Sequence, residues 1–199
     1  MPRENKSRYA LLGMLTYQPM SGYDMKKMSD HSIGHFWNEN YGAIYPVLRR
    51  LEEEGLVTKV RHEQEGAPAR NVYSITEDGR RVFEDWLRRP PDRMLLREEL
   101  LLQVFFGQWT EPEVVLAKLE AEDRRCRQII ENLEGIRDHI DRGGDVPADA
   151  PAEMAAAMNS GAPYWRATVE YGLHYYAGIR RWCDETRKGL GRLIEEEER

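Results

Sequence analysis

The sequence predicts a mainly α-helical protein in two parts, and the spacing of apolar residues supports this expectation. The first part has three short amphipathic segments, then two segments of alternating strand formers and a fourth helical segment. The second part has a densely apolar segment and two long segments with apolar residues every three or four positions. Pro90 and Pro91 separate the parts. We therefore expect one domain over residues 1–89 and a helical domain over residues 93–199.

The third helical segment has the clearest pattern in the chain. Its apolar residues at helical spacing are Ile44, Leu48 and Leu51. On the opposite side, Tyr41, Tyr45 and Arg49 are four residues apart and so share one face. A small helix with an apolar back and a front of tyrosine and arginine suits insertion into a DNA groove.

The ends and the middle of this helix are marked by particular residues. Asn40 is the expected N-cap. Gly55 follows the last apolar residue, where a left-handed C-terminal cap is needed. Pro46 lies inside the helix and lacks a backbone N–H, so we expect one turn to be distorted there.

The elements around this helix complete a DNA-binding arrangement. Residues 7–15 form an apolar first helix, and Ser21 starts a second helix with a capping box. Strands are expected over residues 56–62 and 70–75 with a polar turn between them, and Thr76 caps a fourth helix. Three helices followed by a two-stranded hairpin predict a winged helix-turn-helix, in which the third helix enters the major groove.

The same segments resemble the PadR family of bacterial transcriptional regulators. In the first part the matching segments are LLGML (11–15), SGYD (21–24), GAIYPVLRRLEEEGLV (42–57) and RNVYSITEDG (70–79). In the second part REELLLQVFFG (97–107) and EYGLHYY (170–176) resemble the longer subfamily with an all-helical C-terminal domain. In the wing, Asn71 and Val72 replace part of a basic and aromatic run that the family often has. The resemblance implies a dimer of two winged helices, and such regulators often sense phenolic acids or planar hydrophobic drugs.

The net charge of −6 is unusual for a DNA-binding protein, but it is unevenly distributed. Residues 1–92 hold 14 basic and 14 acidic residues, so the remaining 15 basic and 21 acidic residues account for the whole net charge. The basic residues of the first part gather at Arg3, Lys6 and Arg8, at Lys26 and Lys27, at Arg49 and Arg50, and at Lys59, Arg61 and Arg70. A basic stripe on a neutral domain suffices for phosphate contact and predicts strong salt sensitivity.

We expect the DNA contacts to come from the third helix, its neighbour and the wing. The candidate DNA-binding residues are Tyr23, Lys26, Asn40, Tyr41, Tyr45, Arg49, Arg50, Arg61 and Arg70. Tyr45 is expected to reach a phosphate, and Arg49 a phosphate or a base edge. Arg61 and Arg70 are expected to touch phosphate or the minor groove. The alternative for each is an ordinary solvated side chain, and for Lys26 both interpretations stay open.

The second part is expected to be a bundle of helices that also forms a dimer. Residues 93–106 are apolar on most sides and predict a buried helix. A capping box at Thr110 predicts the start of a long helix, and a linker over residues 143–151 precedes a short helix at 152–158. The last helix, 164–194, is long enough to need a partner subunit, which predicts a homodimer. Its apolar seam comprises Trp165, Val169, Gly172, Tyr176, Ile179, Cys183, Thr186, Leu190 and Leu193.

Aromatic residues of the second part suggest an effector site. The candidate effector-binding residues are Trp109, Trp165, Tyr171, His174 and Tyr175. Aromatic faces with phenol and imidazole donors suit a phenolic or planar hydrophobic effector. The alternative is plain dimer packing, and a pocket between subunits would use the same residues.

The predicted function is a sequence-specific transcriptional regulator, a homodimeric repressor released from operator DNA by a small aromatic or planar effector. No nucleophilic triad, phosphate-binding loop, paired carboxylates or metal-ligand cluster indicates an enzyme, and we expect no metal and no cofactor. His31 and His35 have a spacing that can bind metal, but no further ligand joins them. The alternative is a helical protein-interaction adaptor with the winged helix as scaffold. Two distant cysteines, no long apolar run and no signal peptide predict a cytoplasmic protein without membrane contact.

Overall fold

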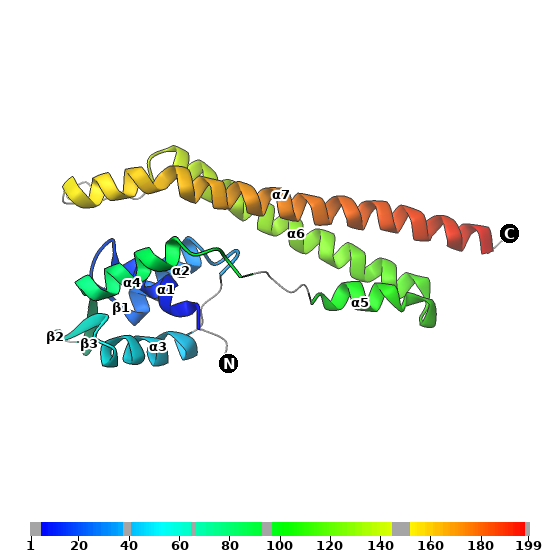
Figure 1. The fold of residues 1–199 in the computed structure, drawn as a ribbon. Coiled ribbons are helices and arrows are strands. Elements are labelled where there is room, and N and C mark those ends of the chain that lie inside the picture. Colours follow the sequence, from blue (N-terminus) through cyan, green and yellow to red (C-terminus); the bar gives the residue numbers. More distant parts are fainter. Residues whose placement is uncertain (1–4, 38–40, 65–66, 93–96, 145–151, 198–199) are drawn as a thin grey trace. The chain divides into compact units, whose positions relative to one another are not determined.

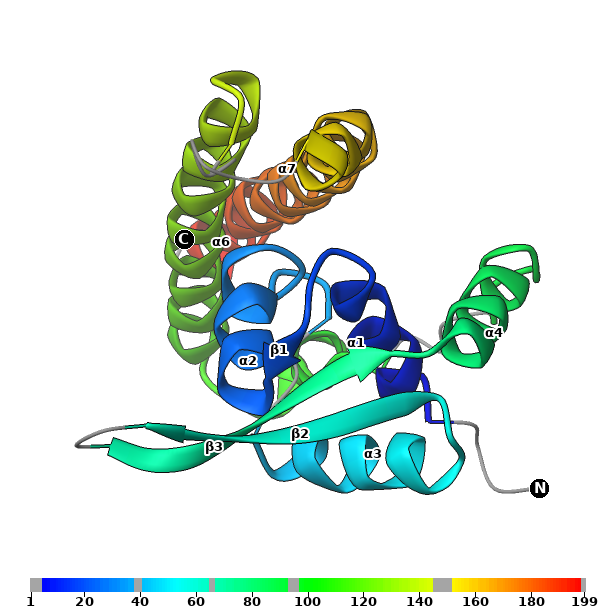
Figure 2. The same cartoon turned by 90° about the vertical axis from the view of Figure 1, so that its left-hand side faces the viewer.

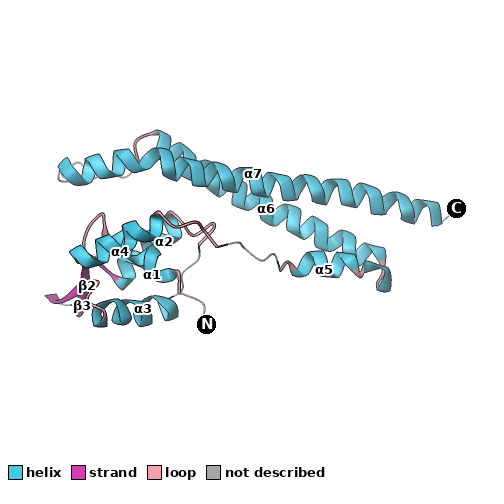
Figure 3. Cartoon of the chain, in the orientation of Figure 1, coloured by secondary structure: helices cyan, strands magenta, loops and turns pink. Residues whose placement is uncertain are grey.

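The computed structural model of the chain describes residues 5–37, 41–64, 67–92, 97–144 and 152–197 (Figure 1). Contacts between residues divide the chain into two compact units. The first unit comprises residues 1–92 and 145–162, and the second comprises residues 93–144 and 163–199. The strands lie in residues 1–92, whereas the described residues of the second unit are helices and their connections (Figure 3).

The described residues between 5 and 92 form four helices and a small sheet. The elements are α1 (Ser7–Leu15), β1 (Met20–Ser21), α2 (Gly22–His31), α3 (Tyr41–Glu53), β2 (Val57–Gln64), β3 (Ala67–Ile75) and α4 (Glu77–Leu87). The strands are antiparallel in the order β1-β3-β2. Figure 2 shows β2 and β3 as a long hairpin that passes beside α3. This is the winged helix-turn-helix that the sequence predicts.

One apolar core holds these elements together. It is formed by the inner sides of the first three helices with the start of the hairpin, and its fully buried members include Leu11, Leu12, Met25, Ile44, Leu48 and Leu51. The predicted apolar face of α3 is confirmed, because Ile44 and Leu48 are completely buried while Tyr45 and Arg49 are exposed. The core therefore fixes which side of α3 faces the solvent.

Hydrogen bonds of short polar side chains set the ends of the helices. The capping box at α2 is confirmed, with Asp24 N donating to Ser21 Oγ (3.2 Å) and Ser21 N donating to Asp24 Oδ2 (3.0 Å). Thr76 Oγ1 accepts from the backbone N–H of Gly79 at 3.0 Å and starts α4. Gly55 has a φ of 72°, the left-handed conformation expected after α3.

The sheet differs from the sequence prediction in two ways. Met20 and Ser21 form a third strand, β1, which pairs with β3 opposite Tyr73 and Val72. The hairpin is also longer than predicted, because Gln64 pairs with Ala67 and both strands extend into the expected turn. Pro68 is compatible with a strand here, since β1 pairs only farther along β3 and leaves this stretch with an open edge. The helix α3, in which one turn was expected to be distorted at Pro46, is continuous through that residue.

The described residues of the second unit form four helical segments. They are α5 (Glu99–Phe105), the short 3-10 helix η1 (Gly107–Trp109), α6 (Pro112–Asp141) and most of α7 (Ala152–Glu197). Figures 1 and 2 show α6 and α7 side by side, and Arg180 Nε of α7 donates to Asp123 Oδ1 of α6 at 2.8 Å. Val115, Leu119 and Cys183 form a buried cluster between them. Ile179, Cys183 and Leu190 of the predicted seam therefore pack with residues of α6 in the same chain.

Three expectations for this unit were wrong. No described residue of α5 is buried in the chain, although the segment was expected to be a buried helix. The predicted capping box at Thr110 does not form; α6 begins at Pro112 after Glu111, and Thr110 Oγ1 donates instead to the Glu111 carboxylate at 3.1 Å. The predicted short helix and last helix are one helix, α7, which continues through Pro163.

Within the described ranges, no helix is long and apolar enough to cross a membrane.

Candidate nucleic-acid interface

The solvent-facing side of α3 presents aromatic and basic side chains together. Tyr45 is 49% exposed, and Arg49 and Arg50 are exposed beside it. With Pro46 and Glu53 they line a shallow surface hollow of about 290 Å³. A tyrosine hydroxyl and two guanidinium groups are the donors expected for phosphate and guanine recognition.

Tyr45 is positioned by its contact with α2. A Cβ atom placed on Gly22 would lie 2.8 Å from Cε1 of Tyr45, so the ring lies directly over the backbone of Gly22. Gly22 is the first residue of α2 and follows the N-cap Ser21. Its neighbour Tyr23 is 60% exposed, so two tyrosine side chains are accessible near the start of α2.

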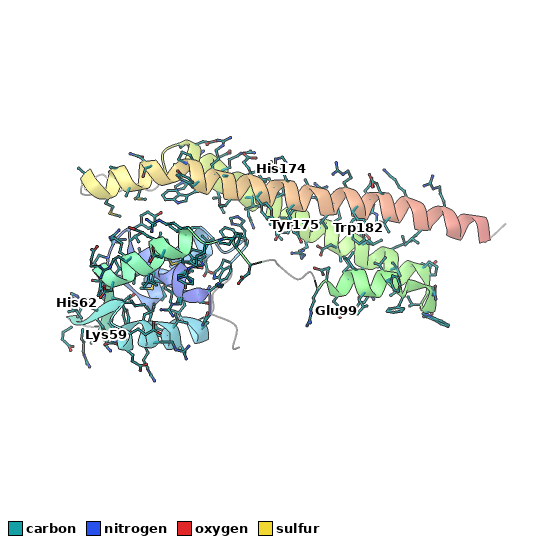
Figure 4. All side chains as sticks on the ribbon, in the orientation of Figure 1. Lys59, His62, Glu99, His174, Tyr175 and Trp182 are labelled. Atoms are coloured by element: carbon teal, nitrogen blue, oxygen red, sulfur yellow. The ribbon has the colours of Figure 1, made fainter. Side chains whose placement is uncertain are left out.

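The hairpin adds basic side chains on both of its faces. Lys59 pairs across the ladder with Tyr73, and Arg61 pairs with Asn71, so Lys59 and Arg61 share one face. His62, one residue along, pairs with Arg70 on the other face. Figure 4 marks Lys59 and His62 on this hairpin.

The lysine and the two arginines among the described residues of the hairpin each contact a carboxylate. The three ion pairs are Lys59 with Glu52 (2.8 Å), Arg61 with Glu63 (2.9 Å) and Arg70 with Asp24 (3.8 Å). The hydrogen bond that Lys59 Nζ donates to the Glu52 carboxylate raises the pKa of Lys59, which therefore stays protonated in neutral solution. Burial raises the pKa of Tyr73, the cross-strand neighbour of Lys59, so its phenol stays neutral.

Some predicted DNA contacts are less accessible or not described. The ammonium group of Lys26 pairs with Asp30 one turn later, and its side chain is largely buried, so this residue is weaker as a contact than Arg49. Asn40 lies outside the described residues, as does the side chain of Tyr41. Lys59 was missing from the predicted site, although its two-residue spacing from Arg61 indicates that they share a strand face.

In the second unit, aromatic residues follow one side of α7. Tyr171 and Tyr175 are stacked, with ring centroids 6.1 Å apart, and the Tyr176 ring meets Tyr175 edge-on at 5.2 Å. The guanidinium of Arg125 in α6 lies 5.8 Å from the centroid of Tyr176. Burial and the neighbouring Tyr176 raise the pKa of Tyr175.

The other predicted effector residues are more scattered. His174 is exposed on α7 next to Tyr175 in the sequence, and Figure 4 labels the two residues on opposite sides of the ribbon, whereas Trp165 is half-buried and lies earlier in α7. Trp109 is 81% exposed and belongs to η1, and Phe105 at the end of α5 and Phe106 between the two helices are also exposed. The structure thus brings Tyr171 and Tyr175 together on α7, with His174 exposed on the same helix, and places Trp109 on a different element.

The described residues offer little for metal or thiol chemistry. They contain no cluster of three or more His, Cys, Asp or Glu side chains that could hold a metal ion, and His31 Nδ1 lies 2.7 Å from the carbonyl oxygen of Lys27. Cys126 and Cys183 are free and buried. Burial and a hydrogen bond to Glu122 raise the pKa of Cys126 to about 12, and burial raises that of Cys183. Both thiols suit a packing role.

Two protein families match this chain. The Transcriptional regulator PadR-like family matches residues 11–85, and the Virulence activator alpha C-term family matches residues 96–191. The Negative transcriptional regulator PadR of Bacillus subtilis is 32% identical over 100 residues, which are 50% of this chain and 55% of that protein. The chain spans about half the length of the curated relatives it matches. These relatives are transcriptional regulators rather than enzymes.

Solved structures share the fold over almost the whole chain. A Streptococcus mutans protein, smu.1604c, has a TM-score of 0.74 and 25% identity, with 90% of this chain and 96% of that chain covered. Bacillus subtilis PadR, solved in complex with operator DNA, has a TM-score of 0.72 and 20% identity, with 94% and 99% covered. At this identity the second likeness concerns the fold alone. A winged helix joined to long C-terminal helices is thus an architecture that these proteins share.

Proposed function

The chain belongs to the PadR-like family of transcriptional regulators, and we propose that it represses transcription as a homodimer that a small aromatic or planar effector releases from operator DNA. The observation that supports DNA binding most directly is the exposed face of α3. Tyr45, Arg49 and Arg50 lie together there, on a helix whose other face is anchored in the core. In a winged helix-turn-helix this is the helix that enters the major groove.

The basic wing supports the same interpretation. Lys59, Arg61 and Arg70 provide cations on both faces of the hairpin, where they can follow a phosphate backbone. The Bacillus subtilis PadR structure with operator DNA shows that a protein of this fold binds DNA. For this chain we propose that residues 1–89 form the DNA-binding domain, with Tyr23, Tyr45, Arg49, Arg50, Arg61 and Arg70 as contacts and with Lys59 added to them.

A homodimer is supported by apolar surface that the single chain leaves uncovered. Phe105 is 77% and Trp109 is 81% exposed, and Leu102 of α5 and Phe106 between α5 and η1 are also exposed. Monomeric soluble proteins rarely expose several large apolar side chains together. We propose that a second copy of the chain covers this surface. Two-fold symmetry would also place two α3 helices on related half-sites of DNA.

Effector binding rests on the aromatic residues of α7. Tyr171 and Tyr175 form an exposed stacked pair, and His174 adds an exposed imidazole on the same helix. The structure of Bacillus subtilis PadR has been solved in complex with p-coumaric acid, a phenolic compound. That protein is named a negative transcriptional regulator. We propose that these residues of α7 contact a phenolic or planar effector, which shifts the dimer towards a state of lower operator affinity.

DNA binding can be tested by fluorescence anisotropy with duplex DNA from upstream of the gene, at two salt concentrations. Replacing Tyr45 and Arg49 together by alanine should weaken operator binding at least about 30-fold, because each lost contact costs about 1–3 kcal/mol. Arg81→Ala on α4 removes an exposed cation elsewhere and serves as the matched control. If the wild type binds operator and scrambled DNA equally, the regulator function is contradicted and an adaptor role is favoured.

The dimer and the effector are tested separately. Light scattering should give twice the 23.3 kDa chain mass for the wild type and a lower mass for Phe105→Ser/Trp109→Ser. Adding p-coumaric acid should lower the anisotropy of the wild-type complex with operator. Tyr175→Ala should need more of the compound for the same release while binding operator normally. Release that is unchanged in this variant would remove Tyr175 from the effector site.

A further inference from the structure

The basic groups of the wing are not free charges. Lys59 pairs with Glu52, whose side chain reaches the hairpin from the last turn of α3. Arg61 pairs with Glu63, two residues along the same strand. The carboxylates therefore lie within the surface proposed to meet DNA, in contact with the two cations that share one hairpin face.

We propose that Glu52 and Glu63 are positioning residues that lower the affinity of this surface for DNA of arbitrary sequence, by holding Lys59 and Arg61 in ion pairs that a phosphate group must displace. This proposal rests on the proposed DNA-binding function. It assigns a role to two acidic residues on a surface where only basic and aromatic residues were expected to act.

The exposure of the pairs makes this exchange feasible. The side chains of Lys59 and Glu52 are 36% and 34% exposed, and those of Arg61 and Glu63 are 71% and 77% exposed. Such pairs are weak, so a phosphate can replace the carboxylate without rearranging the fold. The displaced carboxylate stays within a Debye length of the phosphates and repels them. Lys59 and Arg61 consequently each contribute less to DNA binding than a basic side chain without a carboxylate partner would.

The effect falls mainly on nonspecific binding. Affinity for arbitrary DNA comes almost wholly from phosphate contacts, whereas operator affinity has a further share from base contacts. A genome offers a large excess of nonspecific sites that compete for a regulator. Residues 1–92 have no net charge, and the side chains of Lys59 and Arg61 are already in ion pairs. A smaller fraction of the protein would therefore be bound at those nonspecific sites.

A third contact, between Arg70 and Asp24, has the same character but is longer, at 3.8 Å. Asp24 also accepts hydrogen bonds from the backbone N–H and the hydroxyl of Ser21 in the capping box of α2. Replacing Asp24 would change the stability of that helix together with the surface charge. The carboxylates of Glu52 and Glu63 bond to Lys59 and Arg61 rather than to a helix N-terminus, so replacing them gives the cleaner test.

The test uses the full chain with Glu52→Gln and Glu63→Gln, which remove one charge each and keep the side-chain shape. Anisotropy titrations with a scrambled duplex are run across a salt series. Each variant should bind about fivefold more tightly at 0.1 M salt, and the slope of log affinity against log salt should steepen by up to about 0.9, the value of one phosphate contact. Asp85→Asn is the matched control, because Asp85 pairs with Arg88 on α4, away from the hairpin.

The outcomes separate this proposal from the function on which it rests. If both glutamine variants bind scrambled DNA no better than Asp85→Asn, the carboxylates have no local effect and the proposal is wrong. If no form of the folded protein binds any duplex, the DNA-binding function itself fails. Thermal unfolding of each variant checks that a change in affinity does not come from a change in fold. If Glu52→Gln unfolds at a clearly lower temperature than the wild type, the result for Glu63→Gln decides the test.

Discussion

The aromatic ring of Tyr45 lies against the backbone of Gly22, so that a Cβ atom at Gly22 would come within 2.8 Å of Cε1. This contact joins the exposed face of α3 to the first turn of α2. The absence of a side chain at residue 22 thus helps to set the direction of the tyrosine proposed to reach DNA.

The first prediction concerns this contact. Gly22→Ala should displace the exposed Tyr45 ring and weaken operator binding about tenfold, since contacts to DNA are each worth about 1–3 kcal/mol. The melting temperature should change little, because alanine is a better helix former than glycine. Anisotropy of the single and double variants checks it. In a Tyr45→Ala background the Gly22→Ala change should have no effect, and an equal loss there would show that Tyr45 does not transmit it.

A second prediction contrasts two glycines in helices. A Cβ atom at Gly79 would lie 2.1 Å from the carbonyl oxygen of Leu56, whereas nothing lies within 4 Å of one at Gly135. Gly79→Ala should therefore destabilise the protein by about 2–3 kcal/mol through overpacking. Gly135→Ala should stabilise α6 by about 0.5–1 kcal/mol. Urea unfolding of the two variants measures both changes, and similar midpoints would contradict the packing around Gly79.

A third prediction concerns the thiols. The pKa of Cys126 is raised to about 12 by burial and by Glu122, so fewer than about one thiol in a thousand is ionised at pH 8. Cys183 is also buried, and its pKa is raised. A thiol-specific disulfide reagent should label the native protein very slowly and both cysteines rapidly in urea. Rapid labelling of the folded protein would mean that α6 and α7 separate easily.

The fourth prediction is a dependence of stability on pH. The hydrogen bond from Arg180, with a further one from Arg127, lowers the pKa of Asp123. A folded-state pKa below the unfolded value contributes stability above about pH 4, and this stability is lost as the pH falls through the folded-state pKa. Asp123→Asn should cost about 1 kcal/mol at pH 7, allowing for partial exposure. The difference from the wild type should shrink by pH 3 in urea unfolding, and a constant difference would contradict the linkage.

The parts of the fold that the sequence predicts correctly depend on local chemistry. The two faces of α3 follow from apolar spacing, and the starts of α2 and α4 follow from Ser21 and Thr76, whose hydroxyls have partners three residues away. These interactions lie within one or two helical turns. Tyr45 and Arg49 were identified from the same spacing, which explains why their exposure was predictable.

The errors involve contacts that local patterns do not determine. The two residues of β1 show no alternation, and their strand exists only because β3 lies opposite them. A proline such as Pro163 usually ends a helix, yet α7 continues through it. The ion pair of Lys59 with Glu52 joins residues seven apart on two different elements, so it required the structure. The apolar composition of α5 indicated burial, and the single chain leaves that surface exposed.

Because α7 is one continuous helix, a small change in its tilt at one end produces a large displacement at the other end. A helix of 46 residues is about 69 Å long at 1.5 Å per residue. A tilt of about 5° at one end of such a rod moves the other end by about 6 Å, which is nearly two base-pair steps of 3.4 Å. A ligand that slightly changes the packing around one end of α7 would therefore displace the other end of this helix by several ångströms.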